Sequence, residues 1–303
     1  MTVRSASYNA ALMPKGVEKM AIKTEMVGQT FGPFYYNYNF RDLILFALGC
    51  GAAADGKNDL KYVYEKDQKI LPMIAACPIV ATEVTKTIDW GFDYGGSLHW
   101  GFDFRIHKPL TKLEGTFETM VTLKALYDRG EGRGTLAHNY GETRDKETGE
   151  LLFTNESVDC AILDGGWGGP KAPKDIVEIP DREPDLVVEQ EIPLNQACIY
   201  RLSGDYHPQH IDWEYAQKYG HPRPILHGLS SAGTVCRHII NAVMDGDPDR
   251  LTRFKTRFSK PVLPGCRIRT RIWRFGDNCV HFNVEDCDNP GYYYLNYGLV
   301  EYK

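Results

Sequence analysis

The chain carries the same short pattern twice, half a chain length apart. Residues 102–110 read F-D-F-R-I-H-K-P-L and residues 254–262 read F-K-T-R-F-S-K-P-V, so both fit F-x-x-R-x-x-K-P followed by an aliphatic residue. A second match, between Pro72 and Pro224, has the same offset of 152 residues in a chain of 303. Two matches at one offset predict two copies of one fold. The Gly/Pro-rich stretch at 165–174 predicts the join, with one copy over 1–165 and the other over 166–303.

Each predicted copy is rich in strands and holds one longer apolar segment. Residues 266–275, C-R-I-R-T-R-I-W-R-F, alternate basic and apolar side chains with a period of two, which predicts a strand with its basic side chains on one face. Further strands are expected at 97–110, 115–127, 132–141, 151–163, 280–284 and 292–300, and helices near 72–86 and 224–244. One helix against a curved antiparallel sheet, twice, is an α+β fold in which the two sheets can pair within the chain.

Composition and charge exclude several classes of protein. Apolar residues make up 43% of the chain and charged residues 25%, which is typical of a globular protein. No apolar stretch reaches the roughly 20 residues of a membrane-spanning helix, and the N-terminus lacks the apolar region of a secretory signal. The net charge of −5 argues against nucleic-acid binding, and the eight cysteines form no C-x-x-C pair. We therefore expect a cytoplasmic protein with no membrane and no nucleic-acid partner.

The segment 200–233 concentrates ionisable side chains, turn residues and small residues. Asp205 and His210 are five residues apart, so a tight loop can direct both at one water, and a carboxylate beside an imidazole is a plausible acid/base pair. Gly228 falls in the first turn of a predicted helix, where free backbone N–H groups suit a developing oxyanion. At the repeat offset the first copy has Ala53 and Asn58 in place of the acid and the base. One active site per chain is therefore expected.

Two segments resemble a motif of a known family. Residues 200–212 read Y-R-L-S-G-D-x-x-P-x-H-I-D, and residues 224–229 read P-I-L-H-G-L. Together they resemble the hydratase 2 motif of the MaoC-like hotdog family, in particular its two-copy (R)-specific 2-enoyl-CoA hydratases. Residues 41–52 and 165–169 are also similar to that family. The resemblance implies a double hotdog fold and the reversible addition of water across a trans-2-enoyl-CoA, giving (3R)-3-hydroxyacyl-CoA. It also implies an acyl-CoA substrate, no separate cofactor because coenzyme A is part of that substrate, and a possible homodimer.

The same resemblance assigns roles to individual residues. It implies that Asp205 and His210 are the catalytic pair and that Gly228 donates its backbone N–H to the oxyanion. One departure concerns His207, because the family normally has Asn at this position, and His can titrate and bind metal where Asn cannot. Three residues are expected to modify the site: Asp42, His207 and His227.

Other functions stay open from the residues alone. Thioester hydrolysis is one, because the hotdog scaffold also supports thioesterases. A metal-assisted hydro-lyase is another, because D-x-H-x-x-H-x-D, at residues 205–212, offers four possible ligands, although the family pattern is metal-free and no metal is expected. A third is a module that binds an acyl chain without turnover.

A basic stretch interrupts an otherwise acidic chain. Residues 250–275 contain nine Lys or Arg side chains and no acid. These could hold the phosphates of coenzyme A, or they could form a solvated strand face that protects a sheet edge. The candidate phosphate contacts are Arg257, Lys260, Arg267 and Arg269.

Overall fold

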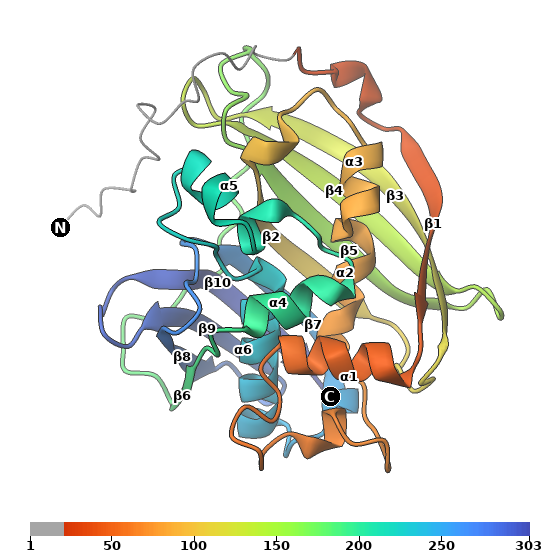
Figure 1. Cartoon of the computed structure of the whole chain (residues 1–303), viewed down its shortest axis with the longest axis vertical. Coiled ribbons are helices and arrows are strands. Elements are labelled where there is room, and N and C mark those ends of the chain that lie inside the picture. Colours follow the sequence, from red (N-terminus) through yellow and green to blue (C-terminus); the bar gives the residue numbers. More distant parts are fainter. Residues whose placement is uncertain (1–20) are drawn as a thin grey trace.

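A computed structural model describes residues 21–303, so the N-terminal segment that bears on the export prediction lies outside the described residues. The described chain forms one antiparallel sheet of ten strands in the order β1-β3-β4-β5-β2-β7-β10-β9-β8-β6 (Figure 1). The strands are β1 (Thr30–Tyr38), β2 (Ser97–Ile106), β3 (Gly115–Asp128), β4 (Thr135–Asp145), β5 (Leu151–Ala161), β6 (Leu186–Glu191), β7 (Leu251–Phe258), β8 (Arg267–Arg274), β9 (Cys279–Asp286) and β10 (Tyr293–Tyr302).

The strand order repeats about the middle of the sheet. Strands β1 to β5 form one half in the order 1-3-4-5-2, and β6 to β10 form the other in the equivalent order 6-8-9-10-7. The halves meet where β2 pairs antiparallel with β7, and in this register Asp103 lies opposite Lys255. These two residues are 152 positions apart, which is the offset of the sequence repeat. The local twofold relation between the halves therefore passes through this pair.

Helices cover one face of the curved sheet (Figure 1). The α-helices are α1 (Phe40–Gly49), α2 (Cys77–Val80), α3 (Thr82–Thr87), α4 (Gln196–Tyr200), α5 (Trp213–Lys218) and α6 (Gly228–Val243). Short 3-10 helices cover Thr24–Met26, Leu60–Tyr62, Pro72–Ala76, Tyr94–Gly96, Arg201–Ser203, Pro208–His210 and Pro248–Arg250. No described helix is long and apolar enough to cross a bilayer.

The two halves differ in their central helix. In the second half the predicted helix is continuous as α6, and nearly all of its first three turns is buried. In the first half the predicted segment 72–86 is divided into a 3-10 turn, α2 and α3, because Ala81 between α2 and α3 has an extended backbone with ψ 141°. The first half therefore lacks a helix equivalent to α6 and has three short pieces in its place.

The predicted alternation in residues 266–275 is confirmed in β8. Ile268 and Ile272 are fully buried on the face toward α6, and Thr270 on the same face bonds through its hydroxyl to His238 Nδ1 of α6 at 2.9 Å. The alternate arginines, Arg267, Arg269 and Arg271, therefore lie on the opposite face of the sheet.

Small residues let α6 approach the end of α1 closely. The hydroxyl of Ser230 donates to the carbonyl of Gly49 at 2.6 Å, and the hydroxyl of Thr234 donates to the carbonyl of Cys50 at 2.9 Å. These bonds satisfy carbonyls that a helix end leaves without an intrahelical partner. A methyl group at Gly233 would lie 2.3 Å from Cys50 Sγ, so only glycine fits at this crossing.

This crossing gives the first testable prediction. Replacing a helical glycine by alanine normally stabilises by about 1 kcal/mol, but Gly233→Ala should lower the free energy of unfolding by about 1–3 kcal/mol, because the overlap with Cys50 outweighs the propensity. Urea denaturation measures the difference. In a Cys50→Ala background the Sγ atom that would overlap the new methyl group is absent, so Gly233→Ala should lower the free energy of unfolding by a smaller amount. An equal loss in both backgrounds would show that the contact is not the cause.

Candidate active site

Asp205 lies on a loop that the first half of the chain holds in place. Thr82, the first residue of α3, donates its backbone N–H to the carbonyl of Gly204 at 3.1 Å. Its hydroxyl accepts from the backbone N–H of Tyr206 at 2.9 Å. Gly204 has φ 108°, which favours glycine at this turn. Gly204 and Tyr206, the neighbours of Asp205, are thus both hydrogen-bonded to Thr82 of the first half, and these bonds fix the position of the Asp205 backbone.

His210 faces Asp205 from the end of the same loop. Its Nδ1–H donates to the carbonyl of Ile225 at 2.9 Å, so the neutral ring presents the lone pair of Nε2. Nε2 lies 3.9 Å from Asp205 Oδ2. This separation is too long for a direct hydrogen bond. Nε2 also lies 3.4 Å from the side-chain nitrogen of the buried Gln209, which can donate to its lone pair. The His210 side chain is 6% exposed and that of Asp205 is 29% exposed, so the carboxylate is the more accessible partner.

Burial sets the protonation of this pair. It lowers the pKa of His210 to about 4, so the imidazole is neutral near pH 7 and can accept a proton. Burial also raises the pKa of Asp205, while the backbone N–H of His207, which donates to Asp205 Oδ1 at 3.2 Å, opposes that rise. A neutral imidazole and a carboxyl group with a raised pKa are therefore placed near each other.

His227 stacks on His210 immediately before α6. The two ring centroids are 3.6 Å apart with an interplanar angle of 24°. The Nε2–H of His227 donates to the carbonyl of Asp205 at 3.2 Å, and burial holds its pKa well below the usual value. Asp205, His210 and His227 offer three possible ligand atoms within 4.8 Å of one another. If a metal bound here, these three residues would hold it, and they differ from the set expected from D-x-H-x-x-H-x-D.

His207 and Asp212, the two other residues of D-x-H-x-x-H-x-D, have structural partners. His207 accepts the backbone N–H of Gln209 at Nδ1 (3.3 Å) and donates from Nε2 to the carbonyl of Tyr94 (3.1 Å). Both ring nitrogens are thus engaged by backbone groups. The Asp212 carboxylate accepts the backbone N–H of Tyr215 and caps α5. Each side chain thus has a local structural partner.

Gly228 is the first residue of α6 and directly follows His227, whose ring stacks on that of His210. A methyl group here would come within 2.9 Å of the ring of Phe258, so the close approach of that ring requires glycine. The backbone N–H groups of a first helical turn have no intrahelical partner and carry the positive end of the helix dipole. The position is chemically suited to an anionic oxygen.

The other sequence-predicted residues lie elsewhere. Asp42 completes a capping box, because its carboxylate accepts the N–H of Asn39 at the start of α1. Arg267 and Arg269 face away from α6, and Arg269 pairs with Glu189 at 2.8 Å. The structure therefore does not bring these arginines to Asp205 and His210.

Arg257 and Lys260 have aromatic rather than acidic neighbours. The Arg257 guanidinium lies over Tyr297 at 4.3 Å, on the outer face of β7. The Lys260 ammonium, two residues beyond the end of β7, lies over Tyr292 at 5.8 Å. Phe258, between them in the sequence, is the residue of this segment that touches Gly228.

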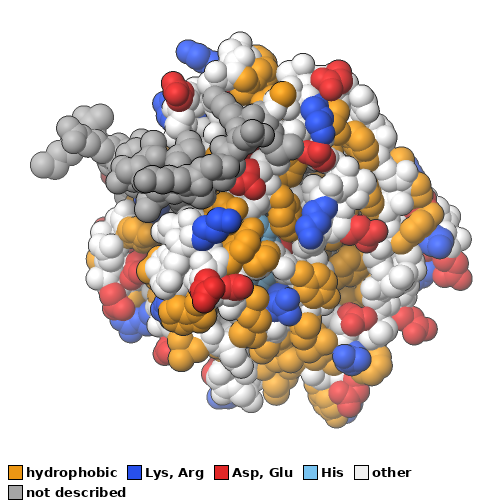
Figure 2. Space-filling model, turned by 45° about the horizontal axis from the view of Figure 1, so that its top comes forward, with side chains coloured by type: hydrophobic (Ala, Val, Ile, Leu, Met, Phe, Trp, Pro, Cys, Tyr) orange, Lys and Arg blue, Asp and Glu red, His pale blue; other side chains and the backbone are white. Residues whose placement is uncertain are grey.

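A hollow leads to histidine side chains on the face shown in Figure 2, and its rim is mostly hydrophobic with several Lys and Arg side chains. Exposed hydrophobic residues of the loop and of α5 include Tyr206, Ile211 and Trp213. Two cations lie near the loop: Arg201 over the ring of Tyr206 at 5.2 Å, and Lys86 over the ring of Tyr94 at 5.2 Å. The sequence analysis did not single out either cation, because no local motif marks them.

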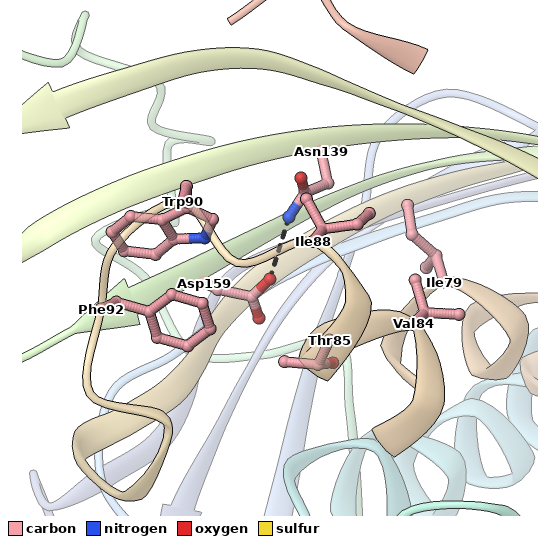
Figure 3. Close-up of a pocket in the computed structure, with 8 residues that line it drawn as sticks. All are labelled: Ile79, Val84, Thr85, Ile88, Trp90, Phe92, Asn139 and Asp159. Atoms are coloured by element: carbon pink, nitrogen blue, oxygen red, sulfur yellow. Dashed lines mark hydrogen bonds between the residues drawn. The ribbon is translucent and has the colours of Figure 1, made fainter. Parts of the chain in front are cut away.

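A small pocket adjoins the site in the first half (Figure 3). It lies between α3 and strands β4 and β5 and encloses about 10 Å³, close to the space that one water needs. Most of its lining is apolar, but Asp159 of β5 and Asn139 of β4 also face it, and Asn139 Nδ2 donates to Asp159 Oδ2 at 3.0 Å. The sequence analysis missed both residues, since each is an isolated polar position within a strand.

A ten-stranded antiparallel sheet with two equivalent halves, the second of which carries Asp205 facing His210, is the architecture of a double hotdog protein. Two family models match the chain: "MFE-2 hydratase 2 N-terminal domain" over residues 36–160 and "MaoC like domain" over residues 175–288. The chain is 33% identical over 296 residues to 3-hydroxyacyl-thioester dehydratase Y of Mycobacterium tuberculosis, covering 93% of this chain and 99% of that protein. The chain therefore belongs to the MaoC-like dehydratase family.

Further relatives agree with this assignment. The chain is 32% identical to mouse peroxisomal multifunctional enzyme type 2 over 86% of its own length, but it spans only 36% of that enzyme. A MaoC-like dehydratase from Phytophthora capsici superposes with a TM-score of 0.79 at 28% identity, covering 93% of this chain and 98% of the other. A Mycobacterium tuberculosis protein described as having a double hotdog fold matches over 91% of this chain and 95% of its own, with a TM-score of 0.56 and 14% identity. These matches confirm the predicted fold.

The buried state of His210 gives a prediction for stability. The unfolded chain protonates this residue near pH 6.5 and the folded chain only near pH 4. Between these pH values the unfolded state binds more protons than the folded state, so the free energy of unfolding decreases as the pH falls. At pH 5 this one group should reduce the free energy of unfolding by about 2 kcal/mol relative to pH 7. Urea denaturation at pH 7 and pH 5 measures this loss. In His210→Gln the loss of unfolding free energy between the two pH values should be smaller than in the wild-type protein by about that amount. An equal loss in both proteins would show that His210 is not the titrating group.

Proposed function

We propose that this chain is a hydro-lyase that adds water to a trans-2-enoyl-CoA to give (3R)-3-hydroxyacyl-CoA, or removes it in the reverse direction. The observation that carries the proposal is the buried His210, neutral near pH 7, whose Nε2 faces Asp205 Oδ2 at 3.9 Å in the segment that precedes the glycine at the start of α6. Two names support the same reaction: that of the relative 3-hydroxyacyl-thioester dehydratase Y, and that of the family model "MFE-2 hydratase 2 N-terminal domain", which matches residues 36–160 of this chain.

In the proposed mechanism the pair handles both protons of the reaction. Asp205 Oδ2 and His210 Nε2 hold one water, and one of them takes a proton from it as its oxygen bonds to Cβ of the substrate. The pair returns a proton to Cα on the same face. The N–H of Gly228 stabilises the thioester oxygen as it gains enolate charge. Hydration transfers no electrons overall, so the reaction requires no redox cofactor.

The first half has a supporting role in this proposal. Its repeat-equivalent positions, Ala53 and Asn58, cannot act as acid and base. It supplies Thr82, which holds the neighbours of Asp205, and Tyr36, whose hydroxyl donates to the Ser203 carbonyl at 2.9 Å at the start of the same loop. We assign to this half the positioning of the loop and the shaping of the acyl pocket.

The coenzyme A phosphates need cations at the mouth of the site. Arg267 and Arg269 lie on the opposite face of the sheet, and Arg269 has an acidic partner. Lys86 and Arg201 lie over aromatic rings beside the catalytic loop, so we assign the phosphate contacts to them in addition to any from Lys260. The cytoplasmic location and the homodimer stay predictions.

Loss of the enoyl-thioester absorbance tests the proposed reaction. Asp205→Asn and His210→Gln should each reduce kcat by about 100-fold or more, because each removes one acid/base partner. Asp212→Asn is the matched control, since Asp212 caps α5 in the same segment, and it should retain most activity. Mass spectrometry of the product separates hydration, which gives a hydroxyacyl thioester, from hydrolysis, which gives free thiol. Activity that a chelator abolishes would instead favour metal bound to Asp205, His210 and His227.

His207 gives an independent test of the site. Its ring is engaged by the backbone groups of Gln209 and Tyr94, so we expect it to position the loop rather than exchange protons. His207→Asn, which restores the residue usual in the family, should keep kcat within about tenfold and leave its pH profile unchanged, because no acid/base group is lost. A loss as large as that of His210→Gln, or a displaced pH profile, would show that His207 takes part in the chemistry.

A further inference from the structure

Gln209 is a buried side chain of the catalytic segment that the mechanism proposed above does not use. It lies in the 3-10 turn Pro208–His210, and only 6% of it is exposed. Its backbone N–H donates to His207 Nδ1 at 3.3 Å, and its carbonyl accepts from the backbone N–H of Ile225 at 3.2 Å. The carbonyl of Ile225 in turn accepts from His210 Nδ1 at 2.9 Å. Ile225 therefore holds both the backbone of Gln209 and the ring of His210, which fixes the two residues relative to each other.

The side-chain amide of Gln209 contacts the edge of His210 that faces Asp205. Its nitrogen lies 3.4 Å from His210 Nε2, and Asp205 Oδ2 lies 3.9 Å from the same ring nitrogen. Because Nδ1 of the neutral ring carries the proton, Nε2 presents a lone pair, and the favourable partner for a lone pair is an N–H of the amide. An amide and a carboxylate thus converge on the ring nitrogen that exchanges protons in the proposed mechanism.

An amide is suited to both protonation states of that nitrogen. It has N–H donors on one side and a carbonyl acceptor on the other, and rotation about the last side-chain bond exchanges them. The amide can therefore donate to the lone pair of the neutral imidazole and accept from Nε2–H once the imidazole carries a second proton. The second bond is the stronger of the two, because its donor is charged. The contact of 3.4 Å is long for a hydrogen bond, so an O–H of water can replace it at the lone pair.

We propose that Gln209 is a positioning residue for the catalytic pair. Its amide holds the Nε2 edge of His210 before the reaction, gives way to the reacting water, and then accepts from the same nitrogen while His210 carries a proton. No covalent bond forms or breaks at Gln209, and the protons pass between water, the pair and the substrate as described above. This inference rests on the proposed hydratase function.

Two substitutions separate this role from a role in packing. Gln209→Met fills nearly the same space without an amide, and Gln209→Asn keeps an amide on a side chain that is one carbon shorter. With trans-2-butenoyl-CoA and trans-2-decenoyl-CoA as substrates, Gln209→Met should lower kcat by about tenfold and leave KM within about twofold, because the lost bond is to His210 and not to the substrate. Gln209→Asn should retain a larger kcat than Gln209→Met. Packing alone predicts the reverse order, since the shorter side chain leaves a cavity.

The chain offers a matched control for these substitutions. Gln217 is an exposed glutamine of α5 in the same segment. Gln217→Met should therefore leave both kcat and KM unchanged. Gln209→Leu, which also lacks an amide, should behave as Gln209→Met does and replaces that variant if it does not fold.

A spectroscopic measurement reports the contact without any substrate. The nitrogen-15 chemical shift of an unprotonated ring nitrogen depends on the hydrogen bond that it accepts, and the signal of His210 is identified by its loss in His210→Gln. At neutral pH, Gln209→Met and Gln209→Leu should displace the Nε2 signal, and Gln217→Met should not.

The outcomes are distinct. An Nε2 signal that stays in place in both Gln209→Met and Gln209→Leu would overturn the inference. A kcat of Gln209→Met that equals the wild-type value or exceeds that of Gln209→Asn would also overturn it. Failure of the wild-type protein to hydrate either substrate would instead refute the proposed function, and the displaced signal would still establish the bond from Gln209 to His210.

Discussion

The pairing of β2 with β7 joins two five-stranded sheets and thereby sets the relative position of everything that they carry. Backbone hydrogen bonds along residues 101–105 and 253–257 form the seam, and Arg253 crosses it to make two bonds of 2.8 and 2.6 Å to the Asp103 carboxylate. Because the halves are in one sheet, the helices of both lie on one face. The catalytic loop of the second half can therefore be held by Thr82 and Tyr36 of the first.

The site shows how burial and backbone carbonyls together prepare an acid/base pair. Neutral imidazoles tolerate burial better than charged ones, and each ring is oriented by a carbonyl: that of Ile225 for His210, and that of Asp205 for His227. These bonds fix which nitrogen carries the proton. The same burial that costs stability in acid keeps His210 able to accept a proton at neutral pH. Burial of His210 therefore lowers the free energy of unfolding at low pH and keeps the imidazole neutral at pH 7.

The sequence predicted those features that depend on local pattern and missed those that depend on contacts between distant segments. The alternation in β8, the presence of a long helix within 224–244 and the proximity of Asp205 to His210 all follow from short-range spacing, although α6 begins at Gly228 and not at Pro224. The strands at 30–38 and 186–191 were not predicted, because both lie at the outer edges of the sheet and their burial pattern is weak. The acidic partners of Arg269 are Glu189, 80 residues away, and Glu285, 16 residues away, and both lie on neighbouring strands. Adjacent sequence therefore did not distinguish an ion pair from a phosphate contact.

The unequal central helices explain why one ancestral pattern can have two different uses in this chain. In the second half α6 is continuous and begins directly after His227, whose ring stacks on that of His210. In the first half the equivalent segment is interrupted at Ala81, so α3 is free to turn toward the other half and hold the loop through Thr82. A continuous helix there would pack against the sheet along its length and fill the space beside Asp159. The half with Ala53 and Asn58 at the repeat-equivalent positions is thus also the half whose central helical segment is divided, and its α3 contributes Thr82 to the loop that carries Asp205.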